Sequence, residues 1–585
     1  MDGTALRARF VESGVLRLAA YERGDPSAPT VLLVHGYPDT HALWDEVATA
    51  LAARYHVVSY DVRGAGASDS PRPKQAYRLS WLARDLKAVA RAVSPDRPVH
   101  LVGHDWGSIQ AWEPVTEPGA ADRIASYTSI SGPCLDHIGH WLAERHDRPT
   151  PHALRQLLSQ YLHSWYVFAF HLPAAAPATW RLGLARQWRR VLHRLEGVTP
   201  RAGHPAPTLA DDAVRGIQLY RANVMPRIRH PRDRYAQVPV QVIQPTRDRY
   251  LLPAFAEGLS RWVPRLWLRR LASPHWAPLT RPAQVTRMIT EFVDHIEGAP
   301  AAPGLARSAV APAAGTPAAR EFGNHLVVVT GAGSGIGRTT ALAFAGAGAE
   351  VVCADIDAES AKRTASAAGG YAYQVDVSDE AAMREFAASV AAEYGVPDTV
   401  VNNAGIGHSG TFLATTTEEW RRVLDVNLWG VIHGCRAFGE LMVQRGEGGH
   451  IVNVSSVAAY LPVKILAAYA TSKAAVFMLS DCLRAELAGH DIGVSTICPG
   501  IVDTNITRTS TFSGLSEAEQ AARQSKAASL YARRGFGPER VAREILKAVR
   551  QGTPVVPVTP EAKVARLLSR ISPASLRAAA RIDVV

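Results

Sequence analysis

The sequence predicts an α/β protein made of two domains in series. Three observations support this prediction. The chain has 585 residues, which is too long for one ordinary hydrophobic core. In both halves, short apolar runs that end in turns alternate with helical stretches, as expected for parallel sheets covered by helices. Between the halves, residues 298–320 are rich in Ala, Pro and Gly and lack periodicity, which is typical of a linker. We therefore expect domains at residues 1–297 and 321–585.

The composition is that of a globular protein, and we expect a cytoplasmic location. Hydrophobic residues make up 47% and charged residues 20% of the chain. The net charge of +11 suits anionic partners, but no nucleic-acid motif accompanies it. The five cysteines are scattered, which favours free thiols in a reducing compartment over disulfides or a metal site. We see neither a signal-peptide pattern nor an apolar stretch long enough to span a bilayer.

In the first half, three apolar runs each end in a turn that carries polar residues. These runs are Thr30–Val34, Tyr55–Tyr60 and Pro98–Val102. In parallel sheets the functional sites lie beyond the carboxyl ends of the strands, which is where these turns fall. From about residue 136 to 234 the pattern changes to helical spacing, as expected for an inserted helical cap. Strand patterns return near residues 238–244 and 266–271.

Asp105 stands at the centre of the turn GHDWG, where a hydrolase of this architecture holds its nucleophile. A carboxylate with an ordinary pKa near 3.9 is already ionised, so it can attack a saturated carbon and form an alkyl ester. A histidine is then needed to activate the water that hydrolyses the ester, and we assign this role to His275, oriented by Asp248. We expect the backbone N–H groups of Tyr37 and Trp106 to form the oxyanion hole.

The motifs HGYP (His35–Pro38) and GHDWG make the segment from about Arg7 to Glu297 similar to epoxide hydrolases of the α/β-hydrolase family. The resemblance implies that Tyr166 and Tyr220 of the cap donate hydrogen bonds to the epoxide oxygen, which gains negative charge as the ring opens. Dehalogenation is the alternative chemistry. Haloalkane dehalogenases tend to have Asn where Tyr37 stands, so this residue favours the epoxide. A non-catalytic binding or scaffold domain is the remaining alternative.

The second half begins with the apolar run Leu326–Thr330, followed by the glycine-rich turn TGAGSGIG and an Ala-rich helical stretch. This context predicts a dinucleotide site, because the turn lets the backbone approach a pyrophosphate at a helix N-terminus. We expect cofactor contacts at Gly331, Ser334, Gly335, Ile336 and Gly337. The next run ends in Asp355, whose carboxylate can accept hydrogen bonds from both ribose hydroxyls and repels a 2′-phosphate. NAD is therefore favoured over NADP.

A catalytic set follows further along the second half. Tyr469 and Lys473 are four residues apart, so on a helix they share one face. The ammonium group of Lys473 can lower the pKa of the Tyr469 phenol from its usual value near 10. Tyr469 then serves as acid or base on the substrate oxygen, while Ser456 holds that oxygen.

The glycine-rich turn, the segment NNAG (Asn402–Gly405), the Ser-Tyr-Lys set and Pro499-Gly500 resemble the short-chain dehydrogenase/reductase family from about Phe322 to Gln551. The resemblance implies a Rossmann-type, doubly wound parallel sheet and a homo-oligomer formed through this domain. It also implies a role in a proton relay for Asn427, and it favours Ser456 over Ser455. Further cofactor contacts are implied at Asn402, Asn403, Asp376, Val377, Tyr469, Lys473 and Thr504.

Together the two halves predict a bifunctional enzyme. We expect epoxide hydrolysis to a diol in the first half and NAD(P)-dependent alcohol/ketone oxidoreduction in the second. The pair resembles fused hydrolase–dehydrogenase proteins of actinobacteria, some of them linked to long-chain lipid metabolism, which points to hydrophobic small-molecule substrates. The tail from Glu561 to Val585 interleaves Arg with Leu and Ile. We expect the tail to dock on protein, with an anionic membrane surface as the alternative.

Overall fold

The computed structural model describes residues 6–199, 201–311 and 321–580. It divides into two compact units, residues 1–317 and 318–585, and each is treated by itself below. Residues 312–320 of the expected linker and the last five residues of the expected docking tail lie outside the described residues. No helix in the described ranges has the length and apolar character needed to cross a membrane.

The first unit is built on a nine-stranded sheet with the order β1-β2-β4-β3-β5-β6-β7-β8-β9. Its strands are β1 (Arg7–Ser13), β2 (Leu16–Arg23), β3 (Thr30–Val34), β4 (His56–Tyr60), β5 (Val99–His104), β6 (Ile124–Ile130), β7 (Val240–Pro245), β8 (Leu266–Leu271) and β9 (Ala309–Val310). Strands β3 to β8 pair in parallel, whereas β1, β2 and β9 join antiparallel. Every residue of β3, β4 and β5 is buried, as expected for strands covered on both faces.

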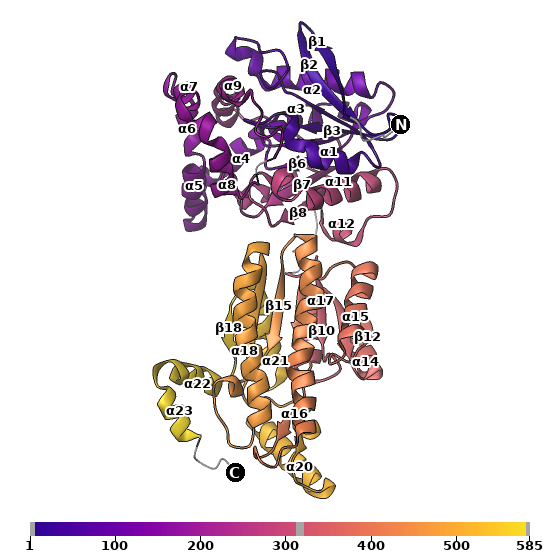
Figure 1. Ribbon diagram of the computed structural model, residues 1–585, viewed down its shortest axis with the longest axis vertical. Helices are drawn as coiled ribbons and strands as arrows, with labels where there is room; N and C mark the ends of the chain where they lie inside the picture. The colour runs from indigo at the N-terminus through magenta and orange to yellow at the C-terminus, as the bar shows by residue number, and fades with distance from the viewer. Residues whose placement is uncertain (1–5, 200, 312–320, 581–585) are drawn as a thin grey trace. The chain divides into compact units, whose positions relative to one another are not determined.

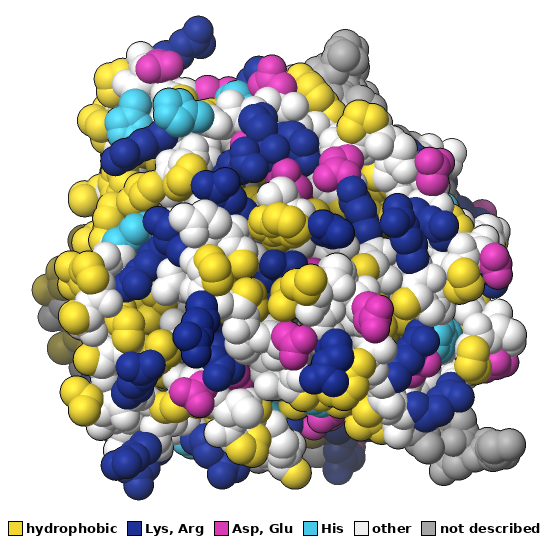
Figure 2. Space-filling model, turned by 90° about the horizontal axis from the view of Figure 1, so that it is seen from above, with side chains coloured by type: hydrophobic (Ala, Val, Ile, Leu, Met, Phe, Trp, Pro, Cys, Tyr) yellow, Lys and Arg dark blue, Asp and Glu magenta, His cyan; other side chains and the backbone are white. Residues whose placement is uncertain are grey.

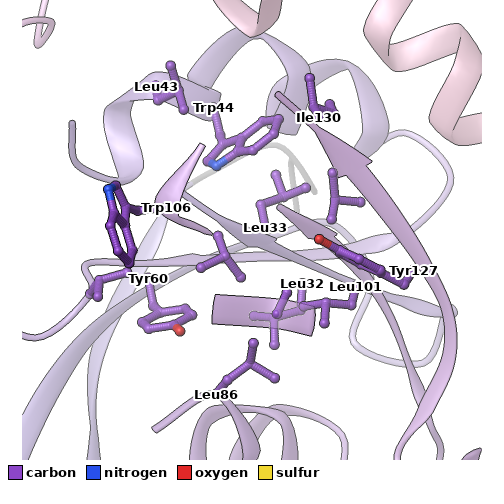
Figure 3. Close-up of a cluster of buried hydrophobic side chains, with 14 of the residues drawn as sticks. Leu32, Leu33, Leu43, Trp44, Tyr60, Leu86, Leu101, Trp106, Tyr127 and Ile130 are labelled. Atoms are coloured by element: carbon purple, nitrogen blue, oxygen red, sulfur yellow. The ribbon is translucent and has the colours of Figure 1, made fainter. Parts of the chain in front are cut away.

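Helices pack on this sheet through apolar stripes. They are α1 (Asp45–Leu51), α2 (Leu79–Val93), α3 (Trp106–Val115), α10 (Ala277–Thr280) and α11 (Pro282–Ile296). In α2 the buried Leu79, Leu82, Leu86 and Val89 recur every three or four residues, which places them on one helix face. Figure 3 shows side chains of β3 and β5 meeting Trp44 and Tyr127 in this core.

A helical segment is inserted between β6 and β7, and we call it the cap. Its elements are α4 (Leu135–Asp147), α5 (Pro151–His163), α6 (Trp165–Phe170), α7 (Ala175–Thr179), η4 (Trp180–Leu184), α8 (Ala185–Glu196) and α9 (Leu209–Arg229). Helix α9 contacts α4, α6, α7 and η4, so it holds the cap together.

The expected linker is shorter than predicted, because part of it belongs to the first unit. Within residues 298–320 the chain forms α12 (Pro303–Arg307) and β9, and β9 pairs antiparallel with β8. Leu305 is completely buried, and the Leu268 N–H donates to the Ser308 carbonyl oxygen at 2.8 Å. The edge of β8 has unpaired backbone groups that this segment satisfies, and composition alone does not reveal such pairing.

The second unit confirms the predicted doubly wound parallel sheet. Its strand order is β12-β11-β10-β13-β15-β16-β18, and all neighbours are parallel. The strands are β10 (Leu326–Thr330), β11 (Glu350–Asp355), β12 (Tyr371–Gln374), β13 (Thr399–Asn402), β15 (Gly449–Val454), β16 (Ile492–Cys498) and β18 (Val555–Pro557). The strand order reverses between β10 and β13, and a crevice for a ligand is expected at such a switch point.

Helices cover this sheet, and α17 and α18 contact β15 (Figure 1). The main helices are α13 (Gly335–Gly346), α14 (Ala358–Ala368), α15 (Glu380–Glu393), α16 (Thr417–Leu424), α17 (Gly430–Arg445), α18 (Ala467–Leu487), α20 (Glu517–Arg534) and α21 (Pro538–Gln551). The short strands β14 (His408–Ser409) and β17 (Thr511–Phe512) pair beside α19 (Ile506–Thr509). The chain continues into α22 (Pro560–Ile571) and α23 (Pro573–Ala579). Helix α22 contacts β18.

Candidate active sites

Asp105 occupies a strained turn between β5 and α3. Its backbone has φ 50° and ψ −123°, a conformation that residues with a side chain rarely adopt. The turn is possible because glycines surround it. A Cβ on Gly36 would lie 2.4 Å from Asp105 Oδ1, and one on Gly107 would lie 2.1 Å from the Val34 carbonyl oxygen. The strain presents the Asp105 carboxylate beyond the carboxyl end of the sheet, as a nucleophile elbow does.

The structure brings the predicted triad together. His275 Nδ1–H donates to Asp248 Oδ2 at 2.9 Å, and His275 Nε2 forms an ion pair with Asp105 Oδ2 at 3.6 Å. The Tyr37 N–H donates to Asp105 Oδ1 at 2.8 Å, so one of the two expected oxyanion donors already faces the carboxylate. Trp106 follows Asp105 directly at the start of α3.

The charges in this cluster favour an imidazolium in the resting site. Burial opposes protonation of His275, but the carboxylates of Asp248 and Asp105 outweigh burial and raise the pKa of the imidazole well above its ordinary value. Asp248 is buried too, yet the positive His275 and hydrogen bonds from the His275 ring and the Tyr250 N–H keep its pKa below the usual range. If Asp105 lost its charge, the imidazole would release its proton more readily.

The two cap tyrosines lie above the nucleophile. Tyr166 comes from α6 and Tyr220 from α9, with ring centroids 5.9 Å apart. The Tyr220 ring also packs 4.8 Å from the ring of Trp106. Burial, and then the charge of Asp105, raise the pKa of both phenols well above the ordinary value. Both therefore keep their protons at neutral pH and can donate them.

Three further residues surround His275 and were not predicted from the sequence. Glu196, at the end of α8, accepts the His275 backbone N–H at 3.0 Å, and burial raises the pKa of this carboxyl. The Tyr250 ring lies 4.7 Å from the His275 ring. His104 Nε2 is 2.9 Å from the His275 carbonyl oxygen, and burial lowers the pKa of His104 to about 4. Tyr250 and His104 could have been suspected, because both lie within two residues of a predicted catalytic aspartate.

In the second unit, the glycine-rich turn has no room for a side chain at Gly331 or Gly337. A Cβ on Gly337 would lie 2.0 Å from the Gly331 carbonyl oxygen, and one on Gly331 would lie 2.8 Å from the Ala404 Cα. Gly331 and Gly335 have φ values of 64° and 52°. Ser334 is exposed at the N-terminus of α13, whereas Ile336 packs against a core cluster. The turn leaves backbone N–H groups at the helix start, as dinucleotide-binding turns do.

Residues of three other loops line the same turn. Asp355, at the end of β11, accepts the Gly333 N–H at 2.8 Å. Asn403 Nδ2 donates to the Thr330 carbonyl oxygen at 3.0 Å, which ties the NNAG segment to the turn. A Cβ on Gly335 would lie 3.2 Å from the Cβ of Thr504. The predicted contacts at positions 355, 403 and 504 therefore meet at the β10–β13 switch point.

The predicted catalytic set gathers near the end of β15. Lys473 is buried on α18, its Nζ donates to the Val454 carbonyl oxygen at 3.0 Å, and burial lowers the pKa of its ammonium group to about 8. Lys473 Nζ is 5.9 Å from the centre of the Tyr469 ring. Ser456 follows β15 and starts a short helical turn, whereas the Ser455 hydroxyl donates to the Lys473 carbonyl oxygen at 2.8 Å. Ser455 thus serves the backbone of α18.

Asn427 lies in a π-helical turn, η7 (Asp425–Trp429), and is fully buried. Its amide accepts the Ile406 N–H at 2.8 Å and donates to the Ile406 carbonyl oxygen at 3.0 Å. A Cβ on Gly405 would lie 3.1 Å from Asn427 Oδ1 and 3.4 Å from Lys473 Nζ. Both groups therefore face the same small space next to Gly405, as a relay through Lys473 requires.

Three of the expected cofactor contacts have other partners. The Asn402 side chain is buried and donates to Asn453 Oδ1 at 2.9 Å, which ties β13 to β15. Asp376 is exposed and accepts the Ser378 N–H at 2.9 Å, as a turn-capping residue does. Val377 is buried, and its carbonyl oxygen lies 3.0 Å from His433 Nδ1. A cofactor role for Asn402, Asp376 and Val377 remains a prediction.

Comparison with known proteins finds a family model for each half of the chain. The family model described as "alpha/beta hydrolase fold" matches residues 29–282, and the one described as "short chain dehydrogenase" matches residues 325–512. "Probable oxidoreductase EphD" of Mycobacterium tuberculosis is 45% identical over 600 residues that cover all of both chains. "Putative oxidoreductase SadH" of the same organism is 34% identical over 259 residues, which cover 43% of this chain and 91% of SadH. A short chain dehydrogenase/reductase from Burkholderia phymatum, solved in complex with NAD, is 31% identical over 42% of this chain and 93% of its own, with a TM-score of 0.39.

Fold, sites and family models together define an enzyme in which a short-chain oxidoreductase is fused to a hydrolase-like domain. The chain belongs to the family of full-length hydrolase-fold and dehydrogenase fusions represented by its mycobacterial relative. Its substrates are small molecules, and the dehydrogenase domain uses a nicotinamide dinucleotide.

Proposed function

We propose that the first unit hydrolyses epoxides to diols through an ester on Asp105. The observation that supports this most directly is the position of Asp105 between an ion-paired His275 and the protonated Tyr166 and Tyr220. Oδ2 of Asp105 attacks a ring carbon, and the carbon–oxygen bond of the ring breaks. The ring oxygen takes a proton from a tyrosine hydroxyl, so the products of this step are an alkyl ester and a phenolate.

Hydrolysis of the ester follows from the charge change at Asp105. The neutral ester no longer favours the imidazolium, so His275 gives its proton to the phenolate and becomes a base. His275 then takes a proton from water, and the hydroxide attacks the ester carbonyl carbon. The N–H groups of Tyr37 and Trp106 stabilise the oxyanion of the tetrahedral intermediate. Its collapse breaks the bond between the acyl carbon and the substrate oxygen, and this oxygen takes the proton of the new carboxyl group. The diol then leaves, with Asp105 again a carboxylate and His275 again an imidazolium.

Trapping the ester tests this proposal. The variant His275→Gln should form the ester but hydrolyse it slowly, so incubation with styrene oxide should raise the mass of the intact protein by one epoxide. The adduct should map to the peptide with Asp105 and be absent from His275→Gln/Asp105→Asn. Diol formation by wild type without an adduct in the variant would contradict the ester. Halide release from a bromoalkane by an enzyme that opens no epoxide would favour the dehalogenase alternative.

We infer that the second unit interconverts a secondary alcohol and a ketone with NAD. The absence of space for side chains at Gly331 and Gly337 fits a bound pyrophosphate. A nicotinamide dinucleotide held by this turn would supply the hydride chemistry of the reaction. Tyr469 takes or returns the hydroxyl proton, Ser456 holds the substrate oxygen, and the buried Lys473 keeps positive charge near the phenol. Asn427 supports Lys473 from the Gly405 side.

The choice of NAD over NADP rests on Asp355. Its carboxylate is fixed at the Gly333 N–H and the Asp357 N–H, at 2.8 and 3.0 Å, so a 2′-phosphate here would meet a negative charge. The ratio of kcat/KM for NAD to that for NADP should exceed one in the wild type and fall in Asp355→Ser. A wild type that prefers NADP would overturn the assignment.

We further propose that both units act on hydrophobic, lipid-like molecules, and that the diol of the first reaction is a substrate of the second. Incubating the full chain with an epoxide and NAD should yield NADH after diol appears. Diol without NADH would disconnect the two steps for that substrate.

We also propose that the chain forms a homo-oligomer through the second unit, in the cytoplasm. Light scattering of the purified chain would test the oligomeric state.

A further inference from the structure

The outer surface of the cap, residues 151–195, exposes an unusual number of large hydrophobic side chains. Among the described residues, 24 large hydrophobic side chains are exposed, and nine of them lie in this segment. We call these nine the cap patch: Leu154, Leu158, Tyr161, Leu162, Trp165, Phe168, Leu172, Leu182 and Leu195. Figure 2 shows hydrophobic side chains next to Lys and Arg side chains on the left of the view, and Figure 1 places α5 and α6 on the left of the first unit.

Helix α5 shows why this surface is unlike an ordinary exterior. Ala153 and Leu157 point into the protein and are buried, as the inner face of a cap helix requires. Leu154, Leu158 and Leu162 recur every fourth residue on the other side, and they are 53%, 63% and 65% exposed. A helix that is apolar on both sides is normally covered on both sides. An exposed apolar patch of this kind marks a contact surface.

The charges around the patch indicate what covers it. Residues 151–195 contain no Asp or Glu and six arginines, and all six arginines are exposed: Arg155, Arg181, Arg186, Arg189, Arg190 and Arg194. Leucines that enter the acyl boundary, a tryptophan at headgroup depth and arginines beside anionic headgroups form the usual combination of an interfacial surface. We propose that the cap patch binds the surface of an anionic lipid bilayer.

This surface adjoins the first active site. Trp165 and Phe168 are 67% and 49% exposed, and Tyr166 lies between them in the chain on the same short helix, α6. Tyr166 is partly buried and meets Tyr220 above Asp105. Given the proposed epoxide hydrolysis, a bilayer that contacts α6 lies one helix away from the groups that open the ring. Apolar epoxides dissolved in the bilayer would thus be concentrated next to the helix that carries Tyr166.

Flotation of the full chain with lipid vesicles tests the proposal. Wild type should float with vesicles of phosphatidylcholine mixed with phosphatidylglycerol, and weakly with phosphatidylcholine alone. Leu158→Glu/Leu162→Glu should reduce flotation about ten-fold or more, because it places charge in the acyl boundary. Arg186→Gln/Arg189→Gln/Arg190→Gln should reduce binding to the anionic vesicles selectively. Both sets of positions are exposed, so thermal unfolding should remain near that of wild type.

A matched control lies in the C-terminal tail, where Leu567 and Ile571 of α22 are 57% and 72% exposed. Leu567→Glu/Ile571→Glu should float like wild type. The proposal is overturned if wild type does not float, or if the tail variant loses flotation and the cap variant does not. It is also overturned if light scattering without lipid shows a dimer in wild type and a monomer in the cap variant, since the patch would then join two copies. Flotation does not depend on epoxide hydrolysis. The membrane proposal can therefore fail while the proposed hydrolysis holds, and the reverse.

Discussion

At the scale of single residues, the first site is governed by the balance of charge around one imidazole. Asp105, Asp248 and Glu196 surround His275, and all three carboxyl groups influence its protonation or its position. A site with a serine nucleophile needs a neutral histidine at the start. Here the nucleophile is charged already, so the imidazolium is a suitable resting partner. The histidine becomes a base when the ester removes the charge of Asp105.

Replacing Tyr220 by Phe removes one of the two donors to the epoxide oxygen. We expect kcat for epoxide opening to fall about 10²-fold, within the range seen when one donor of an oxyanion site is removed. The Tyr220 ring stays in contact with Trp106, so stability should change little. Steady-state diol formation measures the effect. Tyr235→Phe, at a tyrosine that is 45% exposed, is the matched control and should leave the rate unchanged. Equal rates in wild type and Tyr220→Phe would remove Tyr220 from the mechanism.

The Asp248–His275 pair predicts a pH dependence of stability. The pKa of His275 is raised in the folded protein, so its contribution is fully present below its unfolded value near 6.5. The contribution is lost as pH rises through the raised pKa. In Asp248→Asn the imidazole loses its main partner and its folded-state pKa falls, so the loss should be complete at a lower pH than in wild type. The variant should also be about 3 kcal/mol less stable at pH 7, because it breaks a buried pair.

Unfolding of the first unit by denaturant across a pH series measures both effects. Asp233→Asn, whose side chain is 69% exposed beside His140, is the control. A surface pair of this kind contributes little, so this variant should follow wild type. Identical pH profiles for Asp248→Asn and wild type would contradict the assigned coupling.

At the scale of elements, local spacing in the sequence indicates candidate site residues but not the residues that surround them. Asp105, His275, Tyr469 and Lys473 follow strand ends or share a helix face, and such positions are visible in local spacing. Glu196 reaches His275 from a cap helix 79 residues away, and no local pattern signals that contact. The edge strand β9 was missed for a related reason, because its short pairing depends on the neighbouring β8.

The close packing of the glycine-rich turn predicts that a side chain added at the start of α13 weakens NAD binding. In Gly337→Ala the new Cβ would meet the Gly331 carbonyl oxygen at 2.0 Å, so the turn must open. We expect the Kd for NAD to rise about ten-fold or more, since the backbone of this turn must approach the pyrophosphate. Titration calorimetry of the full chain measures the affinity.

Gly346→Ala is the control on the same helix. A Cβ at Gly346 meets no atom within 4 Å, and Ala is the better helix former by about 0.5–1 kcal/mol. This variant should bind NAD as wild type does and be slightly more stable. Normal NAD affinity in Gly337→Ala would mean that the cofactor does not use this turn.

At the scale of the whole molecule, the two units have separate hydrophobic cores. One large cluster of buried residues spans the first unit, and two clusters, one for each side of the parallel sheet, fill the second. Each unit encloses its own catalytic set, so each reaction should survive the loss of the other. Asp105→Ala should abolish diol formation and leave oxidoreduction intact, whereas Tyr469→Phe should do the reverse.

Separate cores also predict two unfolding transitions. A ligand that binds only the folded state stabilises it by about 2.7 kcal/mol when its concentration is a hundred times Kd. NAD should therefore raise the Tm of one transition, and Asp248→Asn should lower the Tm of the other. Calorimetry of the full chain, with and without NAD, separates the two. NAD could instead raise the Tm of both transitions, or calorimetry could show a single transition whose Tm rises with NAD. Either result would mean that the two units unfold as one cooperative body. Ligand binding in the second unit would then stabilise the first, and the prediction of two separately unfolding units would be wrong.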